Sequence, residues 1–143
     1  MSRALAAARR AARAGEVPVG AVLVDPDGRV LAVSGNRVER DRDPTAHAEM
    51  VVLRRAARRL GTPRLFGCDL WVTLEPCAMC AAALALARIR RLYFGAWDPK
   101  GGGVDHGPRI FDQPTVHHRP EVYGGIRERE CAALLRAFFT ARR

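Results

Sequence analysis

The sequence predicts a three-layer α/β/α protein, with a central mixed sheet of about five strands and helices on both faces. Two observations lead to this prediction. Short apolar segments rich in β-branched residues alternate along the chain with segments of helical periodicity. A turn sequence also joins the first two apolar segments directly, which adds an antiparallel pair to the sheet. The length of 143 residues suits a single domain over 1–143.

The first half of the chain predicts a helix, a hairpin and a second helix. Gly15 and Gly61 follow the two helical segments and end them. The turn "PDGR" separates two β-branched runs, so these pair as a hairpin. The inward stripe of the second helix consists of Met50, Leu53, Ala57 and Leu60. The expected elements are helix 3–14, strands 17–25 and 30–35, loop 36–43 and helix 46–60.

The second half of the chain predicts three more strands and two helices. Pro76 suits the first turn of a helix, and glycines and prolines make 99–119 a long irregular stretch. Strand 30–35 with 69–74, and strand 69–74 with 91–96, are each joined through a helix, which predicts parallel neighbours. The expected elements are strands 69–74, 90–97 and 121–125, and helices 77–87 and 127–141.

The composition points to a phosphate-bearing partner and a reducing compartment. The formal charge is +9, from 24 basic and 15 acidic residues, although an arginine-rich and alanine-rich composition accounts for part of this excess. No long uncharged apolar window indicates a membrane span, and the basic start lacks the apolar core of a secretory signal. Four cysteines are too few for a disulfide scaffold, so we expect a cytoplasmic protein.

One histidine and two cysteines are spaced to bind a metal ion. Cys77 and Cys80 are three residues apart at a helix start, where free N–H groups favour thiolates. His47 begins the preceding helix, and both helices follow strands whose carboxyl ends meet at one edge of the sheet. Three such ligands with an open fourth position are typical of one catalytic Zn²⁺.

Glu49 lies two residues after His47 and therefore points in another direction. This position predicts a catalytic base that takes a proton from water activated at the metal. Either part of the pattern alone is weak evidence for a metal site. A core histidine can occur in "HAE", and a redox cysteine pair has the same spacing as "CAMC". The conjunction of "HAE" at one helix start and "PCAMC" at the next predicts a mononuclear zinc site.

The conjunction resembles the H-x-E…P-C-x-x-C signature of the zinc-dependent nucleobase deaminases. Most of the chain, in order, is similar to the bacterial tRNA-specific adenosine deaminases, and residues 105–116 depart from the pattern. The stretches that carry the similarity are "EVPVGAVLV", "GNR", "DPTAHAEM", "VTLEPCAMC", "RIRRLYFGAWDPK" and "ECAALLRAFFTARR". The resemblance implies a cytidine-deaminase-like fold.

The resemblance implies hydrolytic deamination of adenosine to inosine at the wobble position of a tRNA anticodon stem-loop. Hydroxide on the zinc would attack C6 of the flipped-out base, while Glu49 passes a proton to the ring nitrogen and then to the leaving amine. Asn36 would hydrogen-bond the target nucleoside, and Val19 would pack against its base. The backbone at Ala48 and Cys77 would touch the base or the attacking oxygen.

The resemblance also implies contacts outside the catalytic centre. Phe139 would help to close the pocket, Asp98 and Lys100 would contact sugar and phosphate, and Arg142 would contact RNA. Three of the residues have a plainer interpretation: Val19 as strand core, Phe139 as helix core and Arg142 as part of a solvated tail. The resemblance further implies a homodimer, and the apolar helix 77–87 has two sides to cover, one of them by a second copy.

Two alternatives stay open at this point. The first is a zinc-dependent deaminase of a free base or nucleoside, such as guanine or cytosine, with the same chemistry and a closed rim. The second is a zinc-stabilised RNA-binding module without catalysis. Glu49 argues against the second alternative, because a structural zinc has no need of a carboxylate beside an open position.

Overall fold

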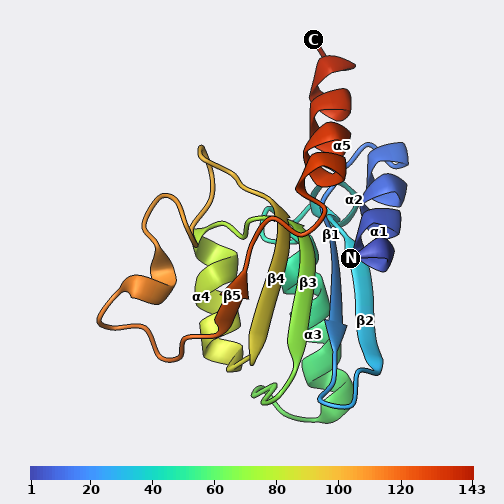
Figure 1. Ribbon diagram of the computed structural model, residues 1–143. Coiled ribbons are helices and arrows are strands. Elements are labelled where there is room, and N and C mark those ends of the chain that lie inside the picture. The colour runs from blue at the N-terminus through green and yellow to red at the C-terminus, as the bar shows by residue number, and fades with distance from the viewer.

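A mixed sheet of five strands runs through the computed structural model, which describes residues 1–143 (Figure 1). The strand order is β2-β1-β3-β4-β5. Strand β1 is antiparallel to β2 and to β3, whereas β3, β4 and β5 are parallel to their neighbours. The strands are β1 (Gly20–Val24), β2 (Val30–Gly35), β3 (Asp69–Leu74), β4 (Arg91–Ala96) and β5 (Glu121–Tyr123).

Helices cover both faces of this sheet, which confirms the predicted three-layer fold. Helices α1 and α5 lie on one face, where they contact each other and strands β1 to β4 (Figure 1). Helices α3 and α4 contact each other on the opposite face. The helices are α1 (Ser2–Arg13), α2 (Val38–Asp41), α3 (Ala48–Leu60), α4 (Ala78–Ala87), a 3₁₀ turn η1 (Ile110–Asp112) and α5 (Glu128–Thr140). None of these helices has the length and apolar character that a membrane span requires.

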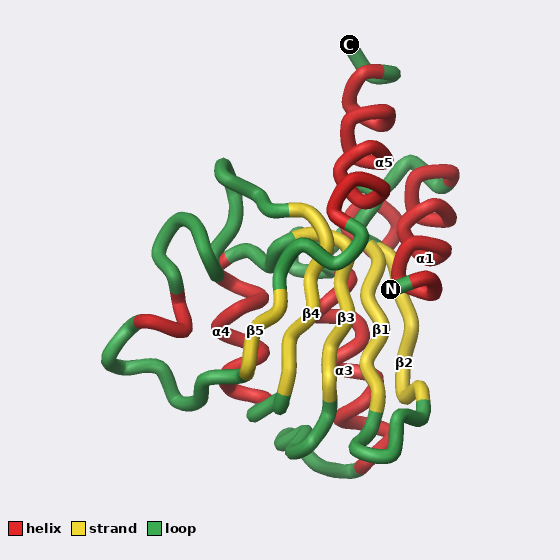
Figure 2. Tube along the Cα trace, viewed as in Figure 1, coloured by secondary structure: helices red, strands yellow, loops and turns green.

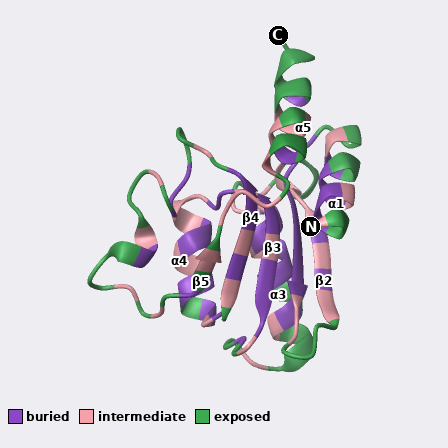
Figure 3. Ribbon diagram, in the orientation of Figure 1, coloured by how far each residue is buried: buried purple, intermediate pink, exposed green.

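The main core lies between the sheet and the α3–α4 layer (Figure 3). Alternate residues of β3 and β4 point into it, and they meet fully buried side chains from the two helices. The principal contributors are Leu70, Val72, Leu92, Phe94, Val52 and Leu84. A smaller cluster of Leu5, Ala96 and Cys131 fastens α1 and α5 to the other face. This core holds the amino-terminal ends of α3 and α4 at the same edge of the sheet.

One predicted neighbour relationship is wrong. Strands 30–35 and 69–74 run in the same direction but do not pair, because β1 lies between them. The hairpin keeps β1 hydrogen-bonded to β2, so the crossover through α3 steps over β1 before β3 adds to its free side. The second predicted pair, β3 with β4, is parallel and adjacent, as expected.

Three local predictions also need correction. The segment 36–43 contains the short helix α2, and β1 begins only at Gly20, since the backbone before it turns at Val17–Pro18. The inward stripe of α3 is displaced by about one position. Its buried residues include Val52 and Ala56, whereas Leu60 is 44% exposed. Helix α3 contacts both strands of the β1–β2 hairpin, and the residues that face these strands form its buried stripe.

A long irregular segment borders the edge where α3 and α4 begin. Between β4 and β5 the chain contains only the turn η1, and Figure 2 shows this segment as an extended loop beside α4. The carboxyl ends of β3 and β4 lead to the same edge. The sheet therefore presents two helix starts and one long loop around a common point, as expected for a site in an open α/β sheet.

Candidate metal centre and catalytic cavity

His47 occupies the N-cap position of α3, at the edge of the sheet. Its backbone is extended, and the helix begins at the following residue, Ala48. The N–H of Ala48 donates to Oδ1 of Asn36, which directly follows β2, at 2.8 Å. This hydrogen bond joins the end of the hairpin to the start of α3 and fixes where the imidazole lies.

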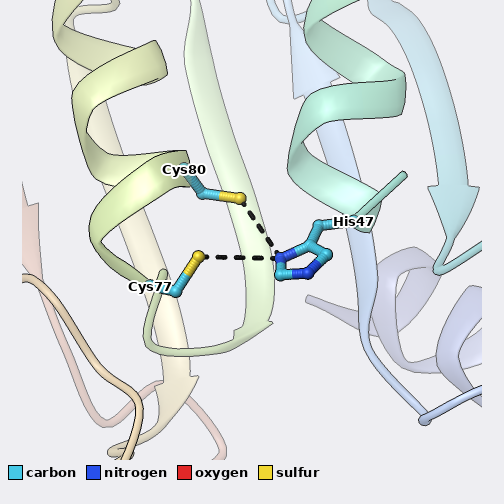
Figure 4. A group of neighbouring side chains, drawn as sticks. All are labelled: His47, Cys77 and Cys80. Atoms are coloured by element: carbon cyan, nitrogen blue, oxygen red, sulfur yellow. Dashed lines mark hydrogen bonds between the residues drawn. The ribbon is translucent and has the colours of Figure 1, made fainter. Parts of the chain in front are cut away.

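Cys77 occupies the equivalent N-cap position of α4, and Cys80 lies in its first turn. Both Sγ atoms are 3.6 Å from Nδ1 of His47, and the three atoms all lie within 4.8 Å of one another (Figure 4). Tetrahedral zinc with a nitrogen at about 2.05 Å and a sulfur at about 2.3 Å places these two atoms about 3.6 Å apart. The donor set and its spacing therefore fit one zinc ion.

The two thiols are electrostatically unequal. The pKa of Cys77 falls to about 4, because Cys80 and His47 donate hydrogen bonds to its thiolate. The pKa of Cys80 rises above its usual range because of the same hydrogen bond and because the thiol is buried. The pKa of His47 is raised by its hydrogen bond to Cys77. The chain thus holds a thiolate at the centre, and a bound cation would favour a second one.

Glu49 lies in the first turn of α3 with its side chain almost fully buried. Burial raises the pKa of its carboxyl group to about 7. Its Oε2 atom is the one buried side-chain oxygen or nitrogen that has no hydrogen-bond partner. A buried carboxylate oxygen without a partner is costly to stability, which indicates a functional group rather than a structural one.

A cavity of about 390 Å³ opens beside these residues. It brings together six of the residues expected at the site, namely Val19, Asn36, His47, Glu49, Cys77 and Asp98. Asn36 uses its Oδ1 for Ala48, so its amide N–H₂ group is available to a ligand. The carboxylate of Asp98 accepts hydrogen bonds from the backbone N–H groups of Lys100 and Gly101, which holds it at this rim.

The other expected residues lie outside this cavity. Ala48 is fully buried behind it and contributes its backbone only. Lys100 is exposed on the loop after β4. Phe139 is 49% exposed on α5, which projects beyond the rest of the fold (Figure 1). Arg142 follows the end of α5, where its guanidinium group lies 3.4 Å from the centre of the Phe138 ring.

The sequence interpretation missed Glu75, which also lines the cavity. Its side chain is fully buried, and its Oε1 lies 2.8 Å from Nδ1 of His106. Its carboxylate also accepts backbone N–H groups from Asp98 and Val104, so it anchors the long loop to the end of β3. The available signal was a charged residue between a buried strand and a metal ligand, in "LEPC".

Glu16 is a second missed residue of the cavity wall. It is buried after α1, and its carboxylate accepts the backbone N–H groups of Glu39 and Arg40 at 3.3 and 2.8 Å. These bonds hold the first turn of α2 against the cavity. No local sequence signal points to them, because the partners are more than twenty residues apart.

Comparison with known proteins agrees with this geometry. Residues 1–96 match the family model of the cytidine and deoxycytidylate deaminase zinc-binding region. The tRNA-specific adenosine deaminase of Agrobacterium fabrum is 59% identical over 143 residues, which cover 100% of this chain and 93% of the relative. The protein of the same name from Bacillus subtilis is 45% identical, over 97% of this chain and 86% of the relative.

A solved structure is similarly close. It comes from studies of A-to-I editing by tRNA:A34 deaminases at the wobble position of transfer RNA. It superposes with a TM-score of 0.92 at 60% identity, over 94% of this chain and 97% of that one. The family match includes His47, Glu49, Cys77 and Cys80. This chain therefore belongs to the family of zinc-binding cytidine and deoxycytidylate deaminases.

Proposed function

We propose that this protein hydrolyses adenosine to inosine at the wobble position of a tRNA anticodon stem-loop. The observation that carries the proposal is the unpartnered buried carboxylate of Glu49, in the same cavity as a histidine and a cysteine at zinc-ligand spacing. The relatives at 59% and 45% identity are both tRNA-specific adenosine deaminases, which supports the choice of substrate.

The reaction adds the oxygen of water to C6 and expels the amino group as ammonia. Zinc bound by His47, Cys77 and Cys80 would supply a Lewis acid that makes water nucleophilic near neutral pH. Glu49 serves the other requirement, which is proton movement: it accepts a proton from the attacking water and gives it to N1 of the ring. It then takes the remaining proton of the added hydroxyl group and passes it to the amine, which leaves as ammonia while C6 becomes a carbonyl. A carboxyl group with a pKa near 7 can both accept and release a proton at physiological pH.

The walls of the cavity orient the base. The amide N–H₂ of Asn36 donates to the nucleoside, and Val19 packs against the ring. A base that is stacked in an RNA helix cannot reach the buried Glu49, so the target nucleotide must leave the stack to enter. A single-stranded anticodon loop lowers the cost of that step, because its bases are easier to unstack than those of a duplex.

Three exposed residues are placed to bind RNA outside the cavity. Lys100 and Arg142 offer exposed charged groups that form no ion pair, although Arg142 also packs on the ring of Phe138. Phe139 offers an exposed ring. We propose that Lys100 and Asp98 contact the sugar and phosphate next to the target. Helix α5 would carry Phe139 and Arg142 to the nucleotides that border the cavity, with Phe139 closing its mouth.

A second copy of the chain is the proposed partner of α4. The outward face of this helix carries Met79, Ala82, Ala83 and Leu86, and Leu86 is 58% exposed. The helix contains no charged residue, and a groove of about 280 Å³ beside it is lined by Ile110 and Val116. Such an apolar surface is typical of a dimer interface.

Light scattering after gel filtration tests the dimer. We expect a dimer for the parent at micromolar concentration and a monomer for Leu86→Arg. Leu60→Arg is the matched control. Leu60 is 44% exposed at the carboxyl end of α3 and does not line the groove beside α4. A monomeric parent, or equal masses for both variants, would overturn the proposal.

Mass spectrometry of the product tests the proposed reaction. The zinc-loaded protein is incubated with an anticodon stem-loop that has adenosine at the wobble position, and in parallel with free adenosine, guanine and cytosine. We expect inosine in the stem-loop at one position only. Turnover of a free base without turnover of the stem-loop would identify a small-molecule deaminase and contradict the proposed substrate.

A further inference from the structure

A second hollow of about 250 Å³ lies next to the catalytic cavity, between α1, β2, α2 and α3. Its floor consists of small residues, including Ala7, Ala11 and Gly35. Helix α1 packs directly on β1 and β2 here, and the glycines of these strands allow the close approach. Its rim carries four arginines from three helices and the segment between β2 and α2, which are Arg10, Arg37, Arg40 and Arg55. We call this hollow the arginine groove.

The arginine groove has an excess of positive charge. Its twelve lining residues include four arginines and one acid, Glu16, which gives a formal charge of +3. Glu16 is buried, and its carboxylate is already occupied by two backbone N–H groups of α2. The excess therefore faces solvent at the rim, where a polyanion can reach it.

Most of these guanidinium groups are free to bind a ligand. Arg37 pairs with Asp41 at 2.9 Å, but Arg10, Arg40 and Arg55 form no ion pair. Arg55 donates one N–H to the carbonyl oxygen of Val33, which leaves its other donors unused. Arginines with unused planar N–H groups are suited to phosphate, which accepts two parallel hydrogen bonds.

The arginine groove adjoins the catalytic cavity. Asn36 and Glu16 line both hollows, so these two residues lie at the boundary between them. Asn36 lines the cavity that takes the base, and the next residue, Arg37, lines the groove. A nucleotide whose base enters beside Asn36 would therefore lie next to the arginines of the groove.

We propose that the arginine groove binds the backbone phosphates of the RNA strand that flanks the target nucleotide. The inference rests on the proposed function and extends it, since it assigns a phosphate path to a surface separate from Lys100 and Arg142. Phosphate contacts fix the register of a strand without reading its sequence. The groove would thus determine which nucleotide stands opposite the cavity.

Arg10→Ala/Arg40→Ala is the variant that tests the groove. Neither side chain has an ion pair or a hydrogen bond of its own to lose, so the fold is retained. The matched control is Arg29→Ala/Arg64→Ala, which removes two exposed arginines at the opposite end of the sheet. Both variants lower the net charge equally, so they differ only in position. Thermal unfolding of each variant checks that the fold is intact.

Fluorescence anisotropy with a labelled anticodon stem-loop measures the dissociation constant at several salt concentrations. We expect the groove variant to bind at least tenfold more weakly than the control variant. Each lost phosphate contact also lowers the slope of log K against log salt by about 0.7 for a single strand, so we expect a slope lower by about 1.4. Equal affinities and equal slopes for the two variants would overturn the inference.

The outcomes separate this inference from the proposed function. If the parent binds the stem-loop through the groove but makes no inosine, phosphate binding by the groove is supported and the proposed reaction is wrong. If the parent makes inosine and the groove variant binds like the control, the proposed reaction is supported and phosphate binding by the groove is wrong. If the parent binds no stem-loop at all, both are wrong.

Discussion

Oδ1 of Asn36 accepts a hydrogen bond of 2.8 Å from the backbone N–H of Ala48. This contact joins the end of β2 to the start of α3 and stands beside His47, Glu49 and the cavity. It occupies the oxygen of the amide and leaves the nitrogen for a ligand. The Asn36 oxygen thus has a structural role and the nitrogen a binding role, and substitutions can separate the two roles.

Replacement of Asn36 by Asp or Ala tests the structural role of its oxygen and the binding role of its nitrogen. Aspartate keeps the acceptor for Ala48, so we expect the stability of the parent. Alanine leaves a fully buried N–H without a partner, and we expect a loss of about 1–3 kcal/mol in the free energy of unfolding. Both variants lack the amide donor, so kcat/KM for the stem-loop falls by tenfold or more in each. Urea unfolding and inosine formation give the two readouts, and parental activity in Asn36→Asp would show that the donor is unused.

Glu49→Gln separates proton transfer from metal binding. Glutamine has the same shape but neither accepts nor releases a proton, so we expect kcat/KM to fall by about 10²–10⁴. The zinc ligands are untouched, and metal analysis should still find one zinc per chain. Stability should equal or exceed that of the parent, because a neutral amide is less costly to bury than a carboxyl group without a partner. Activity within tenfold of the parent would exclude Glu49 as the base.

Zinc content distinguishes the site cysteines from the others. We expect one zinc per chain in the parent and less than a tenth of that in Cys80→Ser, because the hydroxyl group is a poor zinc ligand. Cys68→Ala is the control: Cys68 is buried away from the site, so its removal costs stability but no zinc. A chelator should abolish inosine formation and added zinc should restore it. Equal zinc in the two variants would contradict the ligand set.

The zinc ligands could be predicted because the signal is local. His47 and Cys77 each begin a helix, and each helix follows a strand, so element order alone brings them to one edge. The same reasoning failed for the neighbour of β3, because nothing local shows that the crossover steps over β1. Pairing between strands depends on which sheet edge is free, and that is a property of the whole fold.

The cavity walls depended partly on long-range contacts that the sequence could not show. Helix α2 has only four residues, and its first turn is held by Glu16, more than twenty residues earlier. The loop after β4 is anchored in the same way by Glu75, through backbone groups and His106. A buried acid that binds backbone N–H groups leaves no periodic pattern, so both residues went unrecognised.

Gly103 tests whether the position of this loop matters to the reaction. A Cβ atom on Gly103 would lie 2.5 Å from the backbone nitrogen of Ala78 and 2.8 Å from the carbonyl carbon of Cys77. Because backbone atoms cannot move aside as a side chain can, Gly103→Ala must push the loop away from the start of α4. Overpacking of this kind costs about 1–3 kcal/mol in the free energy of unfolding.

Gly101→Ala is the matched control two residues earlier in the same loop. Its Cβ atom would be nearest to Oδ2 of Asp98 at 3.0 Å, so a shift of a few tenths of an ångström at the end of that side chain relieves the contact. We expect Gly101→Ala to unfold in urea like the parent, and Gly103→Ala to be less stable and to lose tenfold or more in kcat/KM for the stem-loop. Retained zinc in both would place the defect in the rim rather than in the metal centre. Equal stability and activity in the two variants would mean that the contact between the loop and α4 does not hold the rim.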